Sequence, residues 1–224
     1  SKETKLDIIV TPAVTILVGI LVGDFIGPGV SKFMTMLGKI IMSATELQPF
    51  LMGIVVSVLV GVALTLPISS AAICMMLGLS GLAGGAATIG CSCQMMGFAI
   101  ISYKDNGFEG FIAQALGTSM LQVPNTIKNP WIRLPPTLAS AILGPFSTLL
   151  FKMENSPLGS GMGTSGLVGQ ISMINEMGFS FGLFLEIIIM HMILPMLISY
   201  FIYSLMRKKG LIKDGDLKLD LEGK

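Results

Sequence analysis

The residues best suited to chemistry in this chain are Glu154 and the glycine-rich segment Gly159–Gly166 that follows it. Glycine disfavours a regular helix and bare backbone is costly in lipid, so such a segment must line a cavity or be enclosed by protein. A carboxylate at its edge can accept strong hydrogen bonds from the hydroxyl groups of a polar solute. The alternative for Glu154 is an interfacial ion pair with Lys152.

Neutral polar residues surround this segment and a second interrupted region. Asn155 and Thr164 are suited either to hydrogen bonding a solute or to capping short helices. Gln122 and Asn125 flank Pro124. They would face the same cavity as the glycine-rich segment if the two interrupted regions meet, and as helix caps they would need no ligand.

We assign substrate binding to these four residues and Glu154, together with Gly161, Gly163 and His191. The last of these lies in an apolar run with Glu186, five residues before it, about 140° away around a helix. Each needs a partner on another helix or a wet cavity, because a charge in lipid costs a few kcal/mol. The alternative for His191 is a neutral interhelical hydrogen bond.

The composition is that of a membrane protein. Of the 224 residues, 52% are hydrophobic and 12% are charged, whereas soluble domains average roughly 25% charged residues. A net charge of +1 gives no reason to expect a nucleic-acid partner. Cys91 and Cys93 lack the further ligands of a zinc site, so we expect neither a metal nor another cofactor.

Hydropathy predicts an all-α, polytopic membrane protein with about six transmembrane helices, one amphipathic helix and two re-entrant hairpins. Its expected spans are Ile8–Ile26, Phe50–Leu66, Ile68–Leu82, Ala86–Tyr103, Thr137–Phe151 and Phe179–Met206. Glycines separate two of them at residues 83–85, and a kink is expected at Gly144-Pro145.

The remaining segments are too polar or too short to cross the membrane simply. Val30–Leu47, after a helix end at Gly27-Pro28-Gly29, has opposed apolar and polar stripes that indicate an interfacial or bracing helix. Phe108–Asn125 and Ser156–Met177 are short and interrupted, as in hairpins that enter and leave the membrane on one side.

Basic residues give the expected orientation and domain limits. Arg207–Lys209 end the last span and predict a cytoplasmic location for that end. Residues 1–209 form the predicted permease-like domain, and residues 210–224 a solvated tail. The chain begins without methionine, and we expect it to lack further N-terminal helices.

Four motifs in order resemble bacterial phosphotransferase-system enzyme IIC-like membrane proteins. They are Glu46-Leu-Gln-Pro-Phe-Leu-Met-Gly53, Leu64-Thr-Leu-Pro-Ile-Ser-Ser-Ala-Ala72, Gly117-Thr-Ser-Met-Leu-Gln-Val-Pro-Asn125, and Lys152-Met-Glu-Asn155 with Gly161-Met-Gly-Thr-Ser-Gly166. The resemblance implies a homodimeric sugar permease of the bacterial cell membrane. A glutamate and a histidine then lie near the substrate, and Glu154 matches the glutamate by position, in a Met-Glu-Asn setting that departs from the usual motif.

The resemblance also implies cytoplasmic phosphoryl-carrier subunits as partners, because no self-contained catalytic site is present. Two other functions stay open. One is a membrane sensor or regulator that kept the permease fold. The other is an ion-coupled transporter or channel in which Glu154, Glu186 or His191 carries a proton. A neighbouring gene for a phosphoryl carrier would favour the permease.

Overall fold

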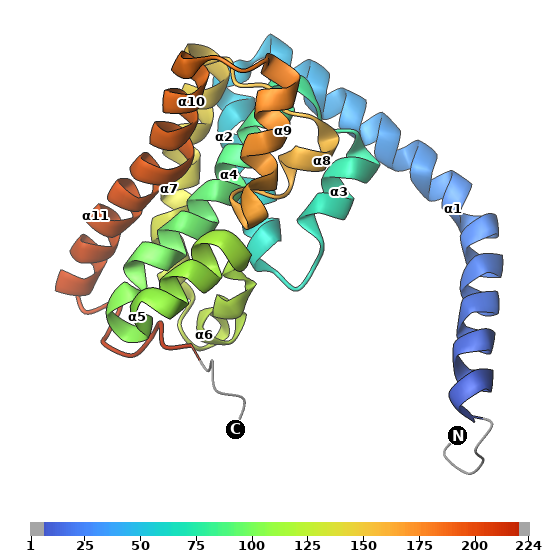
Figure 1. Cartoon of the computed structure of the whole chain (residues 1–224), viewed down its shortest axis with the longest axis horizontal. Coiled ribbons are helices and arrows are strands. Elements are labelled where there is room, and N and C mark those ends of the chain that lie inside the picture. The colour runs from blue at the N-terminus through green and yellow to red at the C-terminus, as the bar shows by residue number, and fades with distance from the viewer. Residues whose placement is uncertain (1–6, 220–224) are drawn as a thin grey trace.

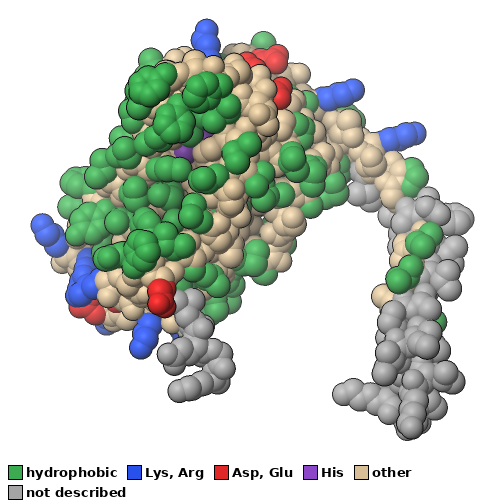
Figure 2. Space-filling model, viewed as in Figure 1, with side chains coloured by type: hydrophobic (Ala, Val, Ile, Leu, Met, Phe, Trp, Pro, Cys, Tyr) green, Lys and Arg blue, Asp and Glu red, His purple; other side chains and the backbone are tan. Residues whose placement is uncertain are grey.

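The computed structural model describes residues 7–219, except for the side chains of residues 7–13, 17, 18, 21–26 and 30. The described residues form helices and no strand, which agrees with the predicted all-α class. Figure 1 shows a helical body from which one long helix projects. Hydrophobic side chains cover the middle of the body, and charged ones gather toward its two ends (Figure 2). This distribution fits a body surrounded by lipid.

Helix α4 (Gly81–Ile101) is the central element, and almost all of its side chains are buried. Around it pack α2 (Pro49–Thr65), α7 (Leu134–Pro145) and α11 (Leu194–Lys208). The helices approach closely because their contacts are built from small residues. Ser57 of α2 donates a hydrogen bond to the Ser140 carbonyl of α7 at 2.8 Å.

The expected helix break at residues 83–85 is wrong, because Ala83, Gly84 and Gly85 lie inside α4. A side chain at either glycine would collide with the main chain of residues 153–155. The Asn155 N–H also donates to the Gly81 carbonyl at 3.2 Å. These glycines are therefore docking points for the segment before the glycine-rich region, and not chain breaks.

The expected span Ile68–Leu82 is also wrong, because α3 (Ser70–Leu77) has only eight residues and the next helix, α4, begins at Gly81. Ser69 caps its beginning, and Gly78 ends it in the left-handed conformation with φ of 66°. A helix of this length rises about 12 Å, which is too short for a bilayer core of about 30 Å.

Helix α1 (Asp7–Leu47) runs without interruption through Gly27-Pro28-Gly29, where a helix end was expected. A proline removes one backbone hydrogen bond and favours a bend, which a long helix can absorb where neighbours do not crowd it. Of the predicted apolar stripe, Phe33, Leu37 and Ile40 are exposed. The body instead contacts the face that carries Gly38 and Thr45, both buried.

Two helices in the described residues are long and apolar enough to cross a membrane, namely Gly81–Ile101 and Phe181–Lys208. The second joins α10 (Phe181–Ile188), a π-helical turn (Ile189–Ile193) and α11, and it corresponds to the predicted last span. Helix α2 is apolar but shorter, at 17 residues. A second π-helical turn (Phe146–Leu150) follows Pro145, near the expected kink.

Two hairpins fill the space beside α4. The first hairpin (residues 103–128) contains α5 (Tyr103–Ile112), a π-helical turn (Ala113–Gly117), a 3-10 turn (Ser119–Gln122) and α6 (Val123–Lys128). A further 3-10 turn (Pro130–Arg133) leads from it into α7. The second hairpin (residues 157–177) contains α8 (Pro157–Ser160), a 3-10 turn (Ser165–Leu167) and α9 (Val168–Met177).

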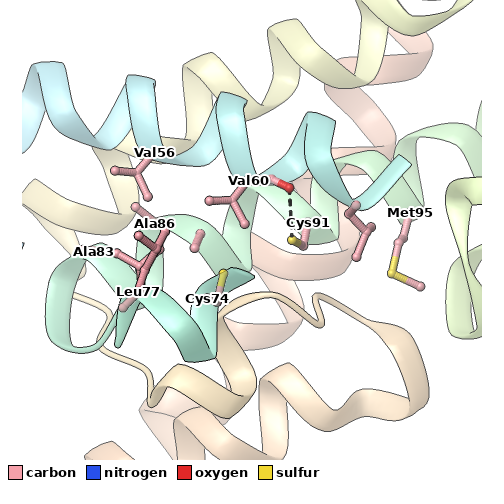
Figure 3. Packing of buried hydrophobic residues seen from close by; sticks show 11 residues of the cluster. Val56, Val60, Cys74, Leu77, Ala83, Ala86, Cys91 and Met95 are labelled. Atoms are coloured by element: carbon pink, nitrogen blue, oxygen red, sulfur yellow. Dashed lines mark hydrogen bonds between the residues drawn. The ribbon is translucent and has the colours of Figure 1, made fainter. Parts of the chain in front are cut away.

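The hydrophobic core lies between α4 and the elements around it. Figure 3 shows the part between α2, α3 and α4, where Val56, Val60, Cys74, Leu77, Ala83, Ala86 and Cys91 pack. The Cys91 thiol lies 3.8 Å from the Val60 carbonyl oxygen, and the three cysteines are buried and unpaired. The cysteines thus serve as small apolar packing residues.

The C-terminal residues 210–219, predicted as part of a solvated tail, are only partly exposed. Ile212 and Leu217 are each only 1% exposed and pack with Phe98, Ile132 and Tyr203. Alternating charge and leucine predicted solvent on both faces, but the leucines find a hydrophobic cluster at the end of α4. Residues 220–224 lie outside the described part of the chain.

Candidate functional site

The tips of the two hairpins touch beside the middle of α4. Thr164 donates a hydrogen bond to the Ala115 carbonyl at 2.6 Å, and Ser165 donates to the Gly117 carbonyl at 2.9 Å. The two interrupted regions of the sequence therefore meet. Their contact uses the ends of the hairpins, and not the residues on either side of Pro124.

A cavity of about 420 Å³ lies next to this contact. It is lined by Leu64, Pro67, Ile68, Ser69, Ser70 and Ala71 from the α2–α3 connection, by Gly117, Thr118 and Met120 from the first hairpin, and by Gly161, Met162 and Ser165 from the second. Three of the four motifs that carry the family resemblance thus contribute to one cavity wall.

The described lining combines hydroxyl groups and backbone with apolar side chains, and it carries no charged side chain. Ser70 donates to the Gly161 carbonyl at 2.7 Å, which ties the α2–α3 connection to the second hairpin. The Thr118 hydroxyl accepts from the Met120 N–H at 3.1 Å. These hydroxyls each have further capacity to donate or accept. The chemistry suits a neutral solute with hydroxyl groups.

Glycines allow the second hairpin to reach the cavity. A Cβ at Gly161 would lie 2.5 Å from the Ser70 carbonyl oxygen, and one at Gly163 would lie 2.7 Å from Cys91. Gly163 also has a φ of 54°, which side chains rarely adopt. Gly161 lines the cavity, whereas Gly163 packs against α4 and supports the tip.

Asn155 and Thr164 are fully buried and bound to the protein itself. The Asn155 amide donates to the Thr88 hydroxyl at 2.8 Å and to the Gly169 carbonyl at 2.9 Å. Thr164 bonds the first hairpin and is not among the residues that line the cavity. Both side chains therefore hold the second hairpin against its surroundings.

Glu154 is exposed and lies outside the cavity lining. Its backbone N–H approaches the Met177 sulfur at 3.3 Å. The ion pairs found among the described residues are formed by Lys104 and Arg207 with Asp214, so the alternative for Glu154, a pair with Lys152, is absent there. The cavity offers no place for this carboxylate in the arrangement described.

Gln122 and Asn125 are buried at the base of the first hairpin, away from the cavity lining. Asn125 donates to the Gln122 amide oxygen at 2.9 Å, and Gln122 donates to Gln114 at 2.9 Å. They do not face the glycine-rich segment as expected. Their other partners are main-chain carbonyls of the C-terminal residues.

His191 is fully buried in the π-helical turn that joins α10 to α11. Its Nδ1 lies 3.0 Å from the Gln170 amide nitrogen and 3.3 Å from the Ser92 hydroxyl. Nδ1 is therefore the ring nitrogen that hydrogen-bonds to α9 and α4, and the tautomer of the ring sets which atom donates. The Nε2 has no partner among the described residues. His191 thus joins α9, α4 and the last span, as the interhelical alternative predicted.

The sequence reasoning did not identify the cavity hydroxyls of Ser69, Ser70, Thr118 and Ser165 as candidate ligands. A signal was present, because the first two lie in the Leu64–Ala72 motif and Thr118 is the second residue of the Gly117–Asn125 motif. Carboxylates and amides were favoured over hydroxyls because they form stronger or more numerous hydrogen bonds. The sequence predicted one long span over Ile68–Leu82 in place of the short α3. It therefore did not reveal that the N-terminus of α3 faces the hairpin tips.

The family model described as "Phosphotransferase system, EIIC" matches residues 1–219 of the 224-residue chain, which therefore belongs to this family. Comparisons with curated proteins and with solved structures gave no match. Membership makes the chain a membrane protein of the phosphotransferase permease class, which works with other components of that system.

Proposed function

We propose that the protein binds and translocates a small neutral polyhydroxylated solute, of the sugar type, in the cavity between the two hairpin tips. The observation that carries this proposal is the uncharged, hydroxyl-bearing lining contributed by both tips and the α2–α3 connection. A volume of about 420 Å³ falls within the usual range of small-molecule sites. Membership of the EIIC family supports a permease.

We further propose that both hairpins are re-entrant and enter from opposite sides of the bacterial cell membrane. The end of the body at the base of the first hairpin carries Lys104, Lys128, Arg133 and Arg207. The excess of basic residues makes this the cytoplasmic end. Irregular backbone at the tips then lines a cavity at membrane depth, where such backbone is tolerated.

In this proposal Gly161 and Ser165 contact the solute, while Asn155, Thr164 and Gly163 hold the second hairpin. Gln122 and Asn125 hold the first hairpin, and His191 fixes the last span. Phosphoryl-carrier subunits would approach the basic end from the cytoplasm, because members of this family work with other components of the phosphotransferase system. The homodimer stays a prediction.

The proposal is tested by closing the cavity with Gly117→Leu. A Cβ at Gly117 meets no atom within 4 Å, so the larger side chain can enter the cavity without distorting the backbone. Binding of unphosphorylated mono- and disaccharides and sugar alcohols to the protein in lipid nanodiscs should fall at least about tenfold, as for an anchor contact of about 1.4 kcal/mol. Gly182→Leu, on exposed α10, is the matched control because that glycine is equally uncrowded.

Two further variants distinguish a solute site in the cavity from a solute site at Glu154. Ser165→Ala removes a hydroxyl from the lining and should weaken binding several-fold, at about 0.5–1.5 kcal/mol for one hydrogen bond. Glu154→Gln should leave the affinity within about twofold of wild type. A tenfold loss in Glu154→Gln with unchanged binding in Gly117→Leu would return the solute site to the carboxylate.

A further inference from the structure

The C-terminal residues 210–219, here called the strap, dock against the base of the first hairpin. The side chains of Ile212, Leu217 and Leu219 are at most 9% exposed. The first two enter the hydrophobic cluster that contains Ile101 at the end of α4 and Met206 of α11. The strap therefore connects the last span to the first hairpin through buried side-chain contacts.

Amide side chains of the hairpin recognise the main chain of the strap. The Leu217 carbonyl accepts from Asn106 at 2.8 Å and from Gln122 at 3.1 Å, and the Lys218 carbonyl accepts from Asn125 at 2.8 Å. In return, the Leu219 N–H donates to the Asn106 amide oxygen at 2.7 Å. The bond from Gln122 is buried and the other three are part-buried, so without the strap these donors and acceptors would need other partners.

The same amides join the two arms of the first hairpin. Asn125 bonds Gln122, Gln122 bonds Gln114, and Gln114 donates to the Ser102 hydroxyl at 2.7 Å. Gln114 and Gln122 lie on either side of the tip residues Gly117, Thr118 and Met120 that line the cavity. The amide network therefore fixes both arms of the tip, and the strap completes it.

Further polar contacts complete the attachment of the strap. Asp214 accepts hydrogen bonds from Lys104 of the first hairpin and from Arg207 of α11. Asn129 donates to the Leu211 carbonyl at 3.0 Å and to the Asp216 carboxylate at 2.7 Å. The contacts of Asp214 are open to solvent, whereas those of Asn129 are part-buried.

We propose that the strap is a conformational brace that holds the tip of the first hairpin in its cavity-lining position, and that its release loosens the tip. The part of this proposal that concerns solute affinity rests on the proposed function of the cavity. The part that concerns the tip itself does not, since it follows from the buried amide network and the docked leucines.

Hydrogen–deuterium exchange in lipid nanodiscs tests the brace without any solute. Chains that end after Gly210 should exchange the backbone amides of residues 113–122 about tenfold faster than wild type, while α9 and α4 stay within about twofold. Leu217→Ser is the second variant, in case the truncated chain fails to insert. Lys213→Gln is the matched control, because that strap side chain is exposed and has no contact among those described.

Unchanged exchange at residues 113–122 in a folded strap variant would overturn the brace. A second experiment measures the binding of a sugar for which the wild-type protein shows affinity. The strap variants should change the affinity for that sugar at least about threefold. Faster tip exchange with unaltered affinity would overturn the coupling to the cavity. If no sugar binds even the wild type, the proposed function fails while the exchange result still decides the brace.

Discussion

The two hairpins meet at one cavity but are built by opposite means. The second hairpin holds its place with glycines that let bare backbone press against α3 and α4, as Gly161 and Gly163 do. The first hairpin holds its place with amide side chains, including Gln114 and Gln122, that bond one another and the strap. The close backbone packing of the second hairpin should be sensitive to any added side-chain atom. The amide network of the first hairpin should be sensitive to the loss of any hydrogen-bond partner.

The largest expected effect tests the steric half of this comparison. Gly163→Ala combines a left-handed backbone position with a Cβ 2.7 Å from Cys91, and it should destabilise the protein by about 2–4 kcal/mol. Melting temperature and yield in detergent measure the loss. Gly166→Ala is the control with a similar φ of 53° but a nearest atom at 3.7 Å. Equal losses at both positions would show that backbone strain, and not close packing, sets the cost.

The next effect tests the amide half. Gln122→Leu keeps an approximate shape but leaves the Gln114 amide oxygen without its donor and the Asn125 amide with one acceptor fewer, at about 1–3 kcal/mol for a buried unsatisfied group. The melting temperature should fall accordingly. Ser172→Ala in the second hairpin removes only a part-buried bond to Ser156 and should cost less than about 1 kcal/mol. A larger loss for Ser172→Ala would reverse the comparison.

The smallest effect concerns the ionic attachment of the strap. The hydrogen bond that Lys104 donates lowers the pKa of the Asp214 carboxyl below its ordinary value of 3.8. A carboxyl pKa lowered by folding stabilises the folded form above the ordinary value, and that contribution is lost as the pH falls through the folded pKa. Strap docking should therefore be constant between about pH 8 and about pH 5 and weaken below about pH 4.

The single tryptophan, Trp131, provides the measurement for this last effect. It neighbours Asn129, which bonds the strap at Leu211 and Asp216. The fluorescence of Trp131 should change only in the acidic range, as the strap loosens. In Asp214→Asn, the size of this fluorescence change should be smaller. Because both ion pairs are exposed, the step should shrink in high salt. A step of the same size in Asp214→Asn would assign it to another carboxyl.

The sequence by itself determined the membrane class, the long last span and the two interrupted regions. Composition and glycine placement act locally, so a window of residues suffices to detect that Phe179–Met206 is apolar and that Gly159–Gly166 cannot form a regular helix. The motif order also indicated the family to which the chain belongs. Each of these properties depends on neighbours in sequence.

Only the tertiary structure decided which residues surround the cavity and what the amides bind. Gln122 and Asn125 have partners about ninety positions away, in a segment whose alternating charges predicted solvent. Likewise, Gly84 and Gly85 resemble a chain break until the main chain of residues 153–155 is placed against them. The sequence shows that an amide requires a hydrogen-bond partner and that a glycine permits a close contact. It does not show which of many possible segments provides that partner or contact. Packing of distant segments chooses among them.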